Sequence, residues 1–404
     1  MGITEWLAIG DSFSAGISAD GPSDELNWRC SRFKMSYPYQ MQNSNRMPGN
    51  KTSRKLTFGS CTGESMSDVV NNQIALGEPV SGATYPKIGN PQVVSLSVSG
   101  NDVGFGDVVN NCLYHWFGYH ECDKYLNKST EIIRNETNLV GMKLIVTLTQ
   151  ILSNLRQTKH GKHVQLYVTA YPRFWNDENP QCDNVTWSSS YPDDGILTRS
   201  MRKHMNNLID ELNQIIQDVI EGLSTILGGG IYFVDSFQSA FNGHRFCEVE
   251  TDPEYHNGPI DDKTWFIHFK SPYRDSPSLD NNPSSGNMFD RIDALLIPPK
   301  DGLSTRQRIE AVGGDRTRCN EVYANHDDMT AALKRLAEDD PLENSYLPVS
   351  WMRIMHPKGS GYKVMADAVI DKILEVNRME SQSSLEVQRV VWMWGWYKWL
   401  QRVF

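Results

Sequence analysis

Short apolar runs alternate with longer segments of helical periodicity along much of the chain. Five runs have the composition of buried β-strands: residues 6–9, 55–58, 93–98, 164–168 and 231–234. Apolar residues recur at helical spacing over 139–155 and 201–223, and a last helix is expected after Gly361. Alternating strands and helices favour a parallel sheet with helices on both faces. We therefore predict an α/β protein, a three-layer α/β/α flavodoxin-like sandwich around a central five-stranded parallel sheet.

Two later regions depart from this rhythm. Residues 248–350 are rich in Asp, Asn, Pro and Gly and are irregular apart from a helical patch over 329–336. An aromatic cluster lies within this region, at Trp265, Phe266 and Phe269. A long irregular segment of this kind is typical of a lid or an insertion. We predict one domain over 1–380, with 248–350 inserted as a cap, and a tryptophan-rich tail over 381–404 that is too short to span a bilayer.

Charge and composition narrow the classes of partner. The 404 residues are 39% hydrophobic and 22% charged, which is ordinary for a folded protein, and the formal net charge is −10. The sequence contains no dense run of Lys or Arg, whereas phosphate binding requires a concentrated basic surface. We therefore expect no nucleic-acid partner.

The cysteines and the glycosylation sequons indicate an extracellular chain. Seven cysteines are enough for three disulfides and one further thiol. Asn-X-Ser/Thr sequons, each weak evidence alone because the tripeptide is common, occur at Asn50, Asn127, Asn135 and Asn184. The N-terminal residues lack the basic region of a signal peptide and run straight into a predicted strand. We predict a mature secreted chain whose leader is absent from this sequence.

The strongest chemical signal follows the first predicted strand. Gly10, Asp11 and Ser12 stand there, so Ser12 lies at a strand-to-helix turn whose backbone amides point at a developing oxyanion. Taken alone, this tripeptide fits a helix cap equally well. His356, just before the last predicted helix, is the type of group that accepts a proton from serine at neutral pH. Together they predict Ser12 as nucleophile and His356 as general base.

Two other strand ends offer further oxyanion donors. Gly63 follows the second predicted strand, and a glycine lets the backbone approach a substrate closely. Asn101 follows the third and supplies a side-chain amide. Since active sites of parallel sheets lie at the carboxyl ends of the strands, we predict an oxyanion hole made of the Ser12 and Gly63 amides and the Asn101 side chain.

These segments resemble the four ordered blocks of the SGNH (GDSL-type) hydrolases, most closely those of secreted Streptomyces-type esterases and lipases. The four blocks here are Gly10-Asp11-Ser12, Gly63, Gly100-Asn101-Asp102 and His356-Pro357. The stretches 100–105 (Gly-Asn-Asp-X-Gly-Phe) and 241–247 (Phe-X-Gly-His-X-X-Cys) add to the match, which covers 1–247 and 351–377. The resemblance implies an SGNH hydrolase domain that cleaves esters without a cofactor or a metal.

The resemblance also implies a disulfide pattern. The pairs are Cys30 with Cys61, Cys112 with Cys122, and Cys182 with Cys247. Each such bridge typically adds about 2–4 kcal/mol to the free energy of unfolding. Cys319 is left over, and we expect it to be buried or free rather than catalytic.

One position departs from the family pattern. Many members carry an Asp three residues before the histidine, where this chain has Arg353, whose charge opposes that of an imidazolium. We therefore expect the Arg353 side chain to point away, and a backbone carbonyl, of Arg353 or Ile354, to accept the imidazole N–H. Asp235 or an Asp of the 248–350 insertion is the alternative partner.

Several other polar residues have structural explanations. Asp11 and Asp102 are expected to hydrogen-bond within their own turns. His244 is expected to pack near a disulfide, and His115 and His120 lack the further ligands that a metal site needs.

The predicted activity is ester hydrolysis through an acyl-enzyme, with a small-molecule or lipid ester, lipid-like or aromatic, as substrate. The aromatic residues of the insertion and the tail motivate this choice, and those of the tail also suggest contact with a lipid interface. Two alternatives stay open. One is an acyltransferase that uses the same residues, with an alcohol outcompeting water for the acyl-enzyme. The other is a non-catalytic binding protein, suggested by Arg353 and the long insertion.

Overall fold

The computed structural model describes most of the chain outside the predicted insertion. The described residues are 2–17, 30–75, 83–114, 121–134, 140–161, 163–187, 195–249, 263–268 and 353–403. Several predicted features therefore lie outside them: most of 248–350 with its helical patch, Phe269, Cys319, His115, His120 and Asn135.

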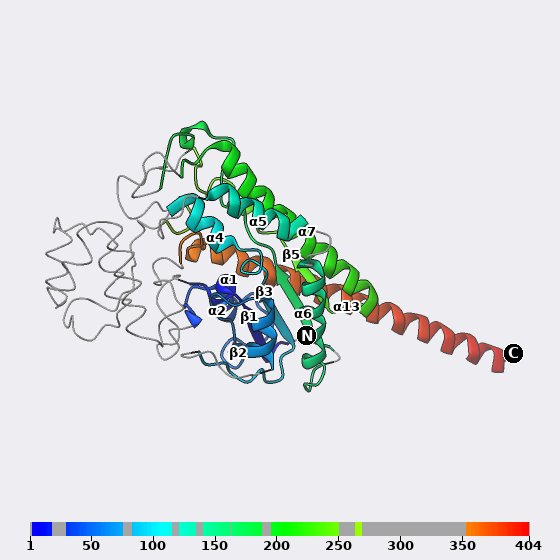
Figure 1. Cartoon of the computed structure of the whole chain (residues 1–404). Coiled ribbons are helices and arrows are strands. Elements are labelled where there is room, and N and C mark those ends of the chain that lie inside the picture. Colours follow the sequence, from blue (N-terminus) through cyan, green and yellow to red (C-terminus); the bar gives the residue numbers. More distant parts are fainter. Residues whose placement is uncertain are drawn as a thin grey trace.

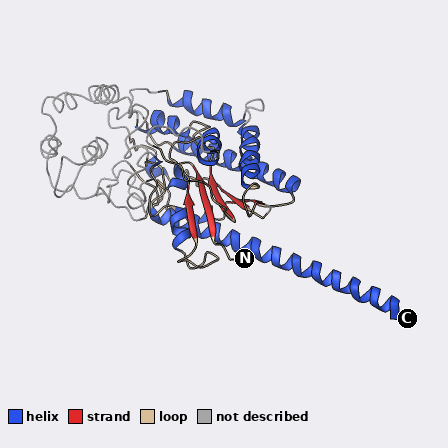
Figure 2. Ribbon diagram, turned by 90° about the horizontal axis from the view of Figure 1, so that it is seen from below, coloured by secondary structure: helices blue, strands red, loops and turns tan. Residues whose placement is uncertain are grey.

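Within these residues a parallel sheet forms the centre of the fold (Figure 2). Its strands are β1 (Glu5–Gly10), β2 (Lys55–Phe58), β3 (Val93–Ser97), β4 (Gln165–Thr169) and β5 (Ile231–Val234). The order is β2-β1-β3-β4-β5, with every neighbouring pair parallel. The side chains of β3 and β4 are buried throughout, as apolar strands covered on both faces should be. The predicted five-stranded parallel sheet is confirmed.

Helices cover both faces of this sheet (Figure 1). On one side, α2 (Tyr37–Asn43) packs against α13 (Gly359–Val403), and on the other α6 (Val140–Leu155) packs against α7 (Arg199–Leu227). The three long helices correspond to those predicted from the apolar spacing, so the α/β/α sandwich is confirmed. α13 continues without a break past the boundary expected at residue 381, and its C-terminal half extends away from the sheet (Figures 1 and 2).

Short helical segments occupy the connections. They are α1 (Ser12–Ala15), α3 (Met66–Asp68), η2 (Val69–Ile74), α4 (Phe105–Val109), η3 (Asn110–Tyr114), α5 (Cys122–Arg134), η4 (Pro180–Cys182) and η5 (Gln238–Phe241). η2 and η3 are π-helical, a rare form that is found frequently at functional sites. η2 directly continues α3 and η3 directly continues α4, in the connections that follow β2 and β3.

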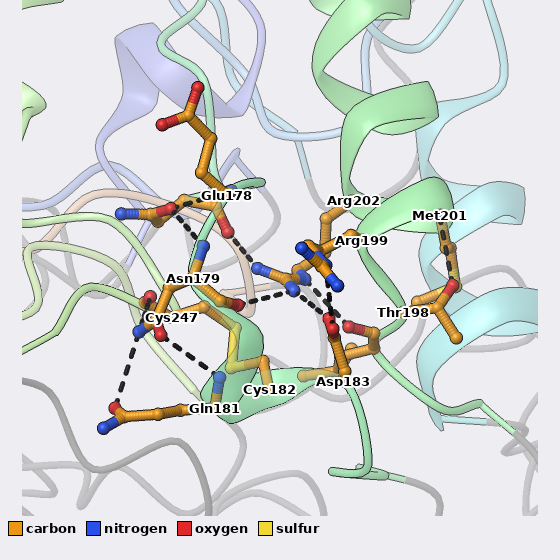
Figure 3. A network of polar contacts seen from close by, with 12 residues as sticks. Glu178, Asn179, Gln181, Cys182, Asp183, Thr198, Arg199, Met201, Arg202 and Cys247 are labelled. Atoms are coloured by element: carbon orange, nitrogen blue, oxygen red, sulfur yellow. Dashed lines mark hydrogen bonds and ion pairs between the residues drawn. A yellow bond between two sulfur atoms is a disulfide. The ribbon is translucent and has the colours of Figure 1, made fainter.

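Disulfides and a buried arginine fasten the loops to this framework. The three described disulfides join Cys30 to Cys61, Cys112 to Cys122, and Cys182 to Cys247, as the resemblance implied. Near the last of these, the fully buried Arg202 of α7 donates hydrogen bonds to the carbonyls of Asn179 and Leu197 and to the Asp183 carboxylate (Figure 3). A buried guanidinium needs such partners for its N–H groups, so the start of α7 is tied to the 179–183 loop.

One short piece of the predicted insertion belongs to the core. Residues 263–268 run beside the turn that precedes α13, and the Phe266 side chain is fully buried. The Ile267 N–H donates to the His356 carbonyl at 2.9 Å, and the Met355 N–H donates to the Ile267 carbonyl at 3.0 Å. This segment is therefore a structural neighbour of the predicted base.

Candidate active site

The turn after β1 presents Ser12 at the carboxyl end of the sheet. Gly10 has φ of +126°, and a Cβ there would lie 2.1 Å from the Ser97 carbonyl oxygen, so only glycine fits. The Asp11 carboxylate then accepts the Phe13 N–H at 3.0 Å and caps α1. Strand end, glycine and cap together fix Ser12 as the first residue of α1.

The structure brings His356 against this serine. The imidazole Nε2 lies 2.6 Å from the Ser12 Oγ, and Nδ1 lies 3.1 Å from the Ile354 carbonyl oxygen. A carbonyl only accepts, so Nδ1 carries the proton, and Nε2 is left with a lone pair facing the hydroxyl. This is the arrangement a general base needs.

The two carbonyls predicted as partners of the imidazole have different roles. That of Ile354 contacts the ring, whereas that of Arg353 accepts the backbone N–H of His356 at 3.0 Å. Met355, between them, has φ of +65°, which turns the chain so that the ring reaches a carbonyl two residues back. The Arg353 side chain is buried, and Asp235 is exposed at a polar cavity lined also by Arg173.

Trp265 joins the His356 turn to His244 through its backbone and its ring. The Lys358 N–H donates to the Trp265 carbonyl at 2.6 Å. The Trp265 ring stacks on His244 at 3.8 Å between centroids and 4° between planes. His244 also places Nδ1 2.6 Å from the Lys263 carbonyl oxygen, in agreement with the packing role predicted for it.

The predicted oxyanion donors lie on three adjacent strand ends. The sheet order puts β1, with Ser12, between β2, which leads to Gly63, and β3, which leads to Asn101. Gly63 is exposed, with φ of +84° and open space where a Cβ would be. The Asn101 side chain is exposed too, and its Nδ2 donates to the Glu64 carbonyl at 2.8 Å. One amide hydrogen of Asn101 is thereby used for orientation, and the second remains for a ligand.

A buried polar network lies behind Ser12. Asp11 accepts hydrogen bonds from the Ser97 hydroxyl at 2.6 Å and from the Tyr171 hydroxyl, which in turn accepts the Gly100 N–H at 3.0 Å. Burial is the main cause that raises the pKa of Asp11 to about 6. Tyr171 was not predicted, although it lies just past β4 at the same sheet edge. The network joins the Ser12 turn to the Asn101 turn.

Asp102 differs from the prediction. Instead of serving its own turn alone, its carboxylate accepts the Met66 N–H at 3.0 Å, at the N-terminus of α3. Two buried residues near α3 were also not predicted: Glu64, directly after Gly63, and Gln73 of η2. The only sequence signal for Glu64 is a charged residue beside an oxyanion glycine. Gln73 has no local signal, since its partners are distant in the chain.

The described part of the chain contains no group of three or more His, Cys, Asp or Glu side chains placed to hold a metal ion.

The chain is similar in sequence to two lipases from Streptomyces. No family model matches the chain. A lipase from Streptomyces rimosus is 28% identical over 172 residues, which is 43% of this chain and 54% of that protein. Lipase 1 from Streptomyces coelicolor is 24% identical over 242 residues, covering 60% of this chain and 72% of that protein. The alignment thus spans about half the length of the first relative, and the predicted resemblance to Streptomyces lipases is confirmed.

A solved structure is similar in outline. The extracellular lipase of Streptomyces rimosus aligns with 67% of this chain and 90% of its own, with a TM-score of 0.44 and 23% sequence identity.

Proposed function

We propose that this protein is a serine ester hydrolase, with Ser12 as nucleophile and His356 as general base. The observation that carries the proposal is the 2.6 Å contact between Ser12 Oγ and His356 Nε2. The Ile354 carbonyl selects the tautomer in which Nε2 accepts the serine proton. Sequence similarity to two Streptomyces lipases supports an ester as the reacting group.

The reaction proceeds through an acyl-enzyme. Ser12 Oγ attacks the ester carbonyl carbon while its proton passes to His356 Nε2. The oxyanion of the tetrahedral intermediate accepts hydrogen bonds from the backbone amides of Ser12 and Gly63 and from Asn101 Nδ2. The ester C–O bond then breaks, and the leaving alcohol takes the proton from His356. Water, deprotonated by the same imidazole, then attacks the acyl-enzyme. The bond between the acyl carbon and Ser12 Oγ breaks, the imidazolium returns the proton to Oγ, and the acid is released.

A carbonyl rather than a carboxylate orients His356 in this mechanism. A carbonyl dipole fixes the tautomer but stabilises the imidazolium less than a full negative charge does. We therefore expect a slower enzyme than one with an Asp beside the histidine. Arg353, which is buried in the same turn, stands where an Asp would supply that negative charge.

We propose a lipid-like or aromatic ester as substrate, and the similarity to two lipases supports the lipid-like class. The Phe13 ring lies 4.9 Å from that of His356 and 6.5 Å from that of Phe174, which in turn contacts Phe266 at 5.2 Å. All three phenylalanines are buried in the core beside the pair. The tryptophans of the tail support contact with a lipid interface. Among the residues described, no helix is both long and apolar enough to cross a membrane.

The disulfides support a location outside the cytosol. Three bridges form and persist in an oxidising compartment, and we propose that the protein is secreted. Three of the four sequons, at Asn50, Asn127 and Asn184, are exposed in the fold, which supports glycosylation.

Hydrolysis of p-nitrophenyl esters from acetyl to palmitoyl tests the proposed activity. Ser12→Ala is expected to lower kcat by about 10⁴-fold or more, because the nucleophile is lost. Ser14→Ala is the matched control: this buried serine contacts Ser60 instead of His356, and kcat should stay within about tenfold of the wild type. The chain-length optimum separates a lipase from a short-acyl esterase.

Equal hydrolysis by wild type and Ser12→Ala would overturn the proposed nucleophile. A folded wild type that neither hydrolyses any ester nor reacts with a fluorophosphonate would instead favour the binding-protein alternative.

A further inference from the structure

Glu64 is a buried carboxylate beside the predicted oxyanion glycine. Its side chain is 5% exposed and accepts hydrogen bonds from Asn72 Nδ2 at 3.1 Å, from the Tyr85 hydroxyl and from Gln73 Nε2. All three donors are neutral. Burying a charged group is costly unless hydrogen bonds compensate for lost water, so these contacts hold the carboxylate in one place. Gly63, the preceding residue, is therefore anchored through its neighbour.

The backbone of Glu64 reaches the third strand end. Its carbonyl accepts Asn101 Nδ2 at 2.8 Å, although Asn101 is otherwise exposed. An exposed amide side chain samples several rotamers unless a bond fixes it. The Glu64 carbonyl thus sets the direction of the second Nδ2 hydrogen, the one available to an oxyanion.

Gln73 joins this residue to the nucleophile turn. Its Oε1 accepts the Gly10 N–H at 2.8 Å, and its Nε2 donates both to the Gly10 carbonyl at 2.8 Å and to the Glu64 carboxylate. Regular pairing of β1 with β2 ends at Ala8 and Phe58. Beyond it the Cys61 N–H donates to the Gly10 carbonyl at 2.9 Å, and the Gln73 side chain adds its two bonds to the same residue. Ser12 follows two residues after Gly10.

The π-helical form of η2 explains how this contact arises. Asn72 and Gln73 are consecutive, yet both are buried and both donate to Glu64. Consecutive side chains of a regular α-helix point about 100° apart, so two of them rarely reach the same carboxylate. A π-turn is wider and rare, and it occurs frequently at functional sites. η2 is therefore shaped around Glu64.

We propose that Glu64 and Gln73 are positioning residues that keep the three oxyanion donors in register. Gln73 acts on the Ser12 amide through Gly10, and Glu64 acts on Gly63 and Asn101. The inference rests on the ester hydrolase function proposed above. Because the oxyanion exists only in the transition state and the intermediates, loosening this unit lowers kcat and leaves KM nearly unchanged.

The experiment compares Gln73→Leu and Glu64→Gln with the wild type. Leucine keeps much of the volume of glutamine but forms neither bond to Gly10. Glutamine at 64 replaces one acceptor oxygen by an NH2 group, which in either amide orientation faces a donor, Gln73 Nε2 or Asn72 Nδ2. A misplacement of about 1 Å costs up to about 10²-fold in rate, so kcat should fall about 10- to 100-fold with KM within about twofold. The inhibition constant of a trifluoromethyl ketone, which mimics the tetrahedral intermediate, should rise by the factor by which kcat/KM falls.

Asn206→Leu is the matched control. Asn206 is a buried amide side chain that also bridges a backbone N–H and a carbonyl, both of Trp175, but it belongs to α7. Its substitution should destabilise the fold comparably and leave kcat unchanged. Because Glu64 and Gln73 act as one unit, Glu64→Gln combined with Gln73→Leu should be no slower than the slower single variant, within about threefold.

Hydrogen exchange separates this inference from the proposed function. Segments 59–65 and 99–104 should exchange faster in Gln73→Leu and Glu64→Gln than in the wild type, and not in Asn206→Leu. If the wild type hydrolyses no ester, the hydrolase function fails while exchange still decides whether these side chains hold the loops. Unchanged exchange, unchanged kcat, or an equal loss of kcat in Asn206→Leu would overturn the inference. Glu64→Gln serves alone if Gln73→Leu does not fold.

Discussion

The turns that carry Ser12 and His356 are built in different ways. Ser12 follows β1, the strand between β2 and β3, and its turn is held by Asp11 and Ser97 directly beside it. His356 is 344 positions away, on a turn before α13 that exchanges backbone hydrogen bonds with 263–268. The sheet itself positions the nucleophile, whereas a piece of a separate segment positions the base.

The difference is also visible in the backbone. The Ser12 turn uses a glycine at positive φ, which costs little, whereas the His356 turn places Met355 at φ of +65°. A non-glycine residue in that region costs about 1–2 kcal/mol. Contacts from outside the turn must offset that cost, and the 263–268 segment supplies them. Substitutions in that segment should therefore affect the base before the nucleophile.

Phe266→Ala tests this dependence and should have the largest effect. The ring is fully buried and contacts those of Phe174, Phe241 and Phe246 at 5.1 to 5.6 Å. Its loss should lower the free energy of unfolding by about 3–5 kcal/mol, measured by urea denaturation. Since the same segment braces the His356 turn, kcat/KM should also fall, by about tenfold or more.

Phe237→Ala provides the comparison for that variant. Phe237 is equally buried but lies at the start of η5. We expect a similar loss of stability with kcat/KM within about threefold of the wild type. Equal kinetic losses in the two variants would mean that 263–268 has no special role.

Asp11→Asn tests the turn that carries Ser12 through the pH dependence of the free energy of unfolding. Burial raises the pKa of Asp11 from 3.8 to about 6, so the folded protein keeps a proton that the unfolded chain releases. The contribution of this group is fully present below about pH 4 and is lost as pH rises through about 6. The free energy of unfolding of the wild type minus that of Asp11→Asn should therefore fall by about 2 kcal/mol between pH 4 and pH 7. Urea denaturation across this range measures it, and a constant difference would contradict it.

Gly63→Ala should have the smallest effect on stability among these variants. A Cβ at Gly63 meets open space, so the cost is the positive φ alone, about 1–2 kcal/mol in thermal denaturation. Gly10→Ala is the contrasting variant, because its Cβ would overlap the Ser97 carbonyl at 2.1 Å. It should be far more destabilising than Gly63→Ala. Similar losses in the two would show that the β1 turn is less constrained than its geometry indicates.

Much of the framework was predictable from local pattern. The five strands and the beginnings of the three long helices lie within about two residues of their predicted positions, since apolar periodicity reflects which side chains are buried. α13 ends much later than its apolar face suggested. The Asp11 cap of α1 was predictable too, because it depends on residues adjacent in the chain.

The surroundings of the pair were less predictable. The sequence left two carbonyls and an Asp open as partners of His356, and the turn at Met355 brings the Ile354 carbonyl to the ring. Asp102 was expected to bond within its own turn, but its carboxylate reaches Met66, 36 positions away. No local pattern reports such a contact, since it depends on how two loops meet.

The sequence by itself therefore determined the order of strands and helices, and the residue types that follow each strand. These depend on short-range periodicity and on turn chemistry. The tertiary structure decided which of those residues meet, as when Gln73 contacts Gly10 across 63 positions and residues 263–268 join the His356 turn. The physical reason is that side-chain hydrogen bonds between distant segments form only after the sheet has set the segments side by side.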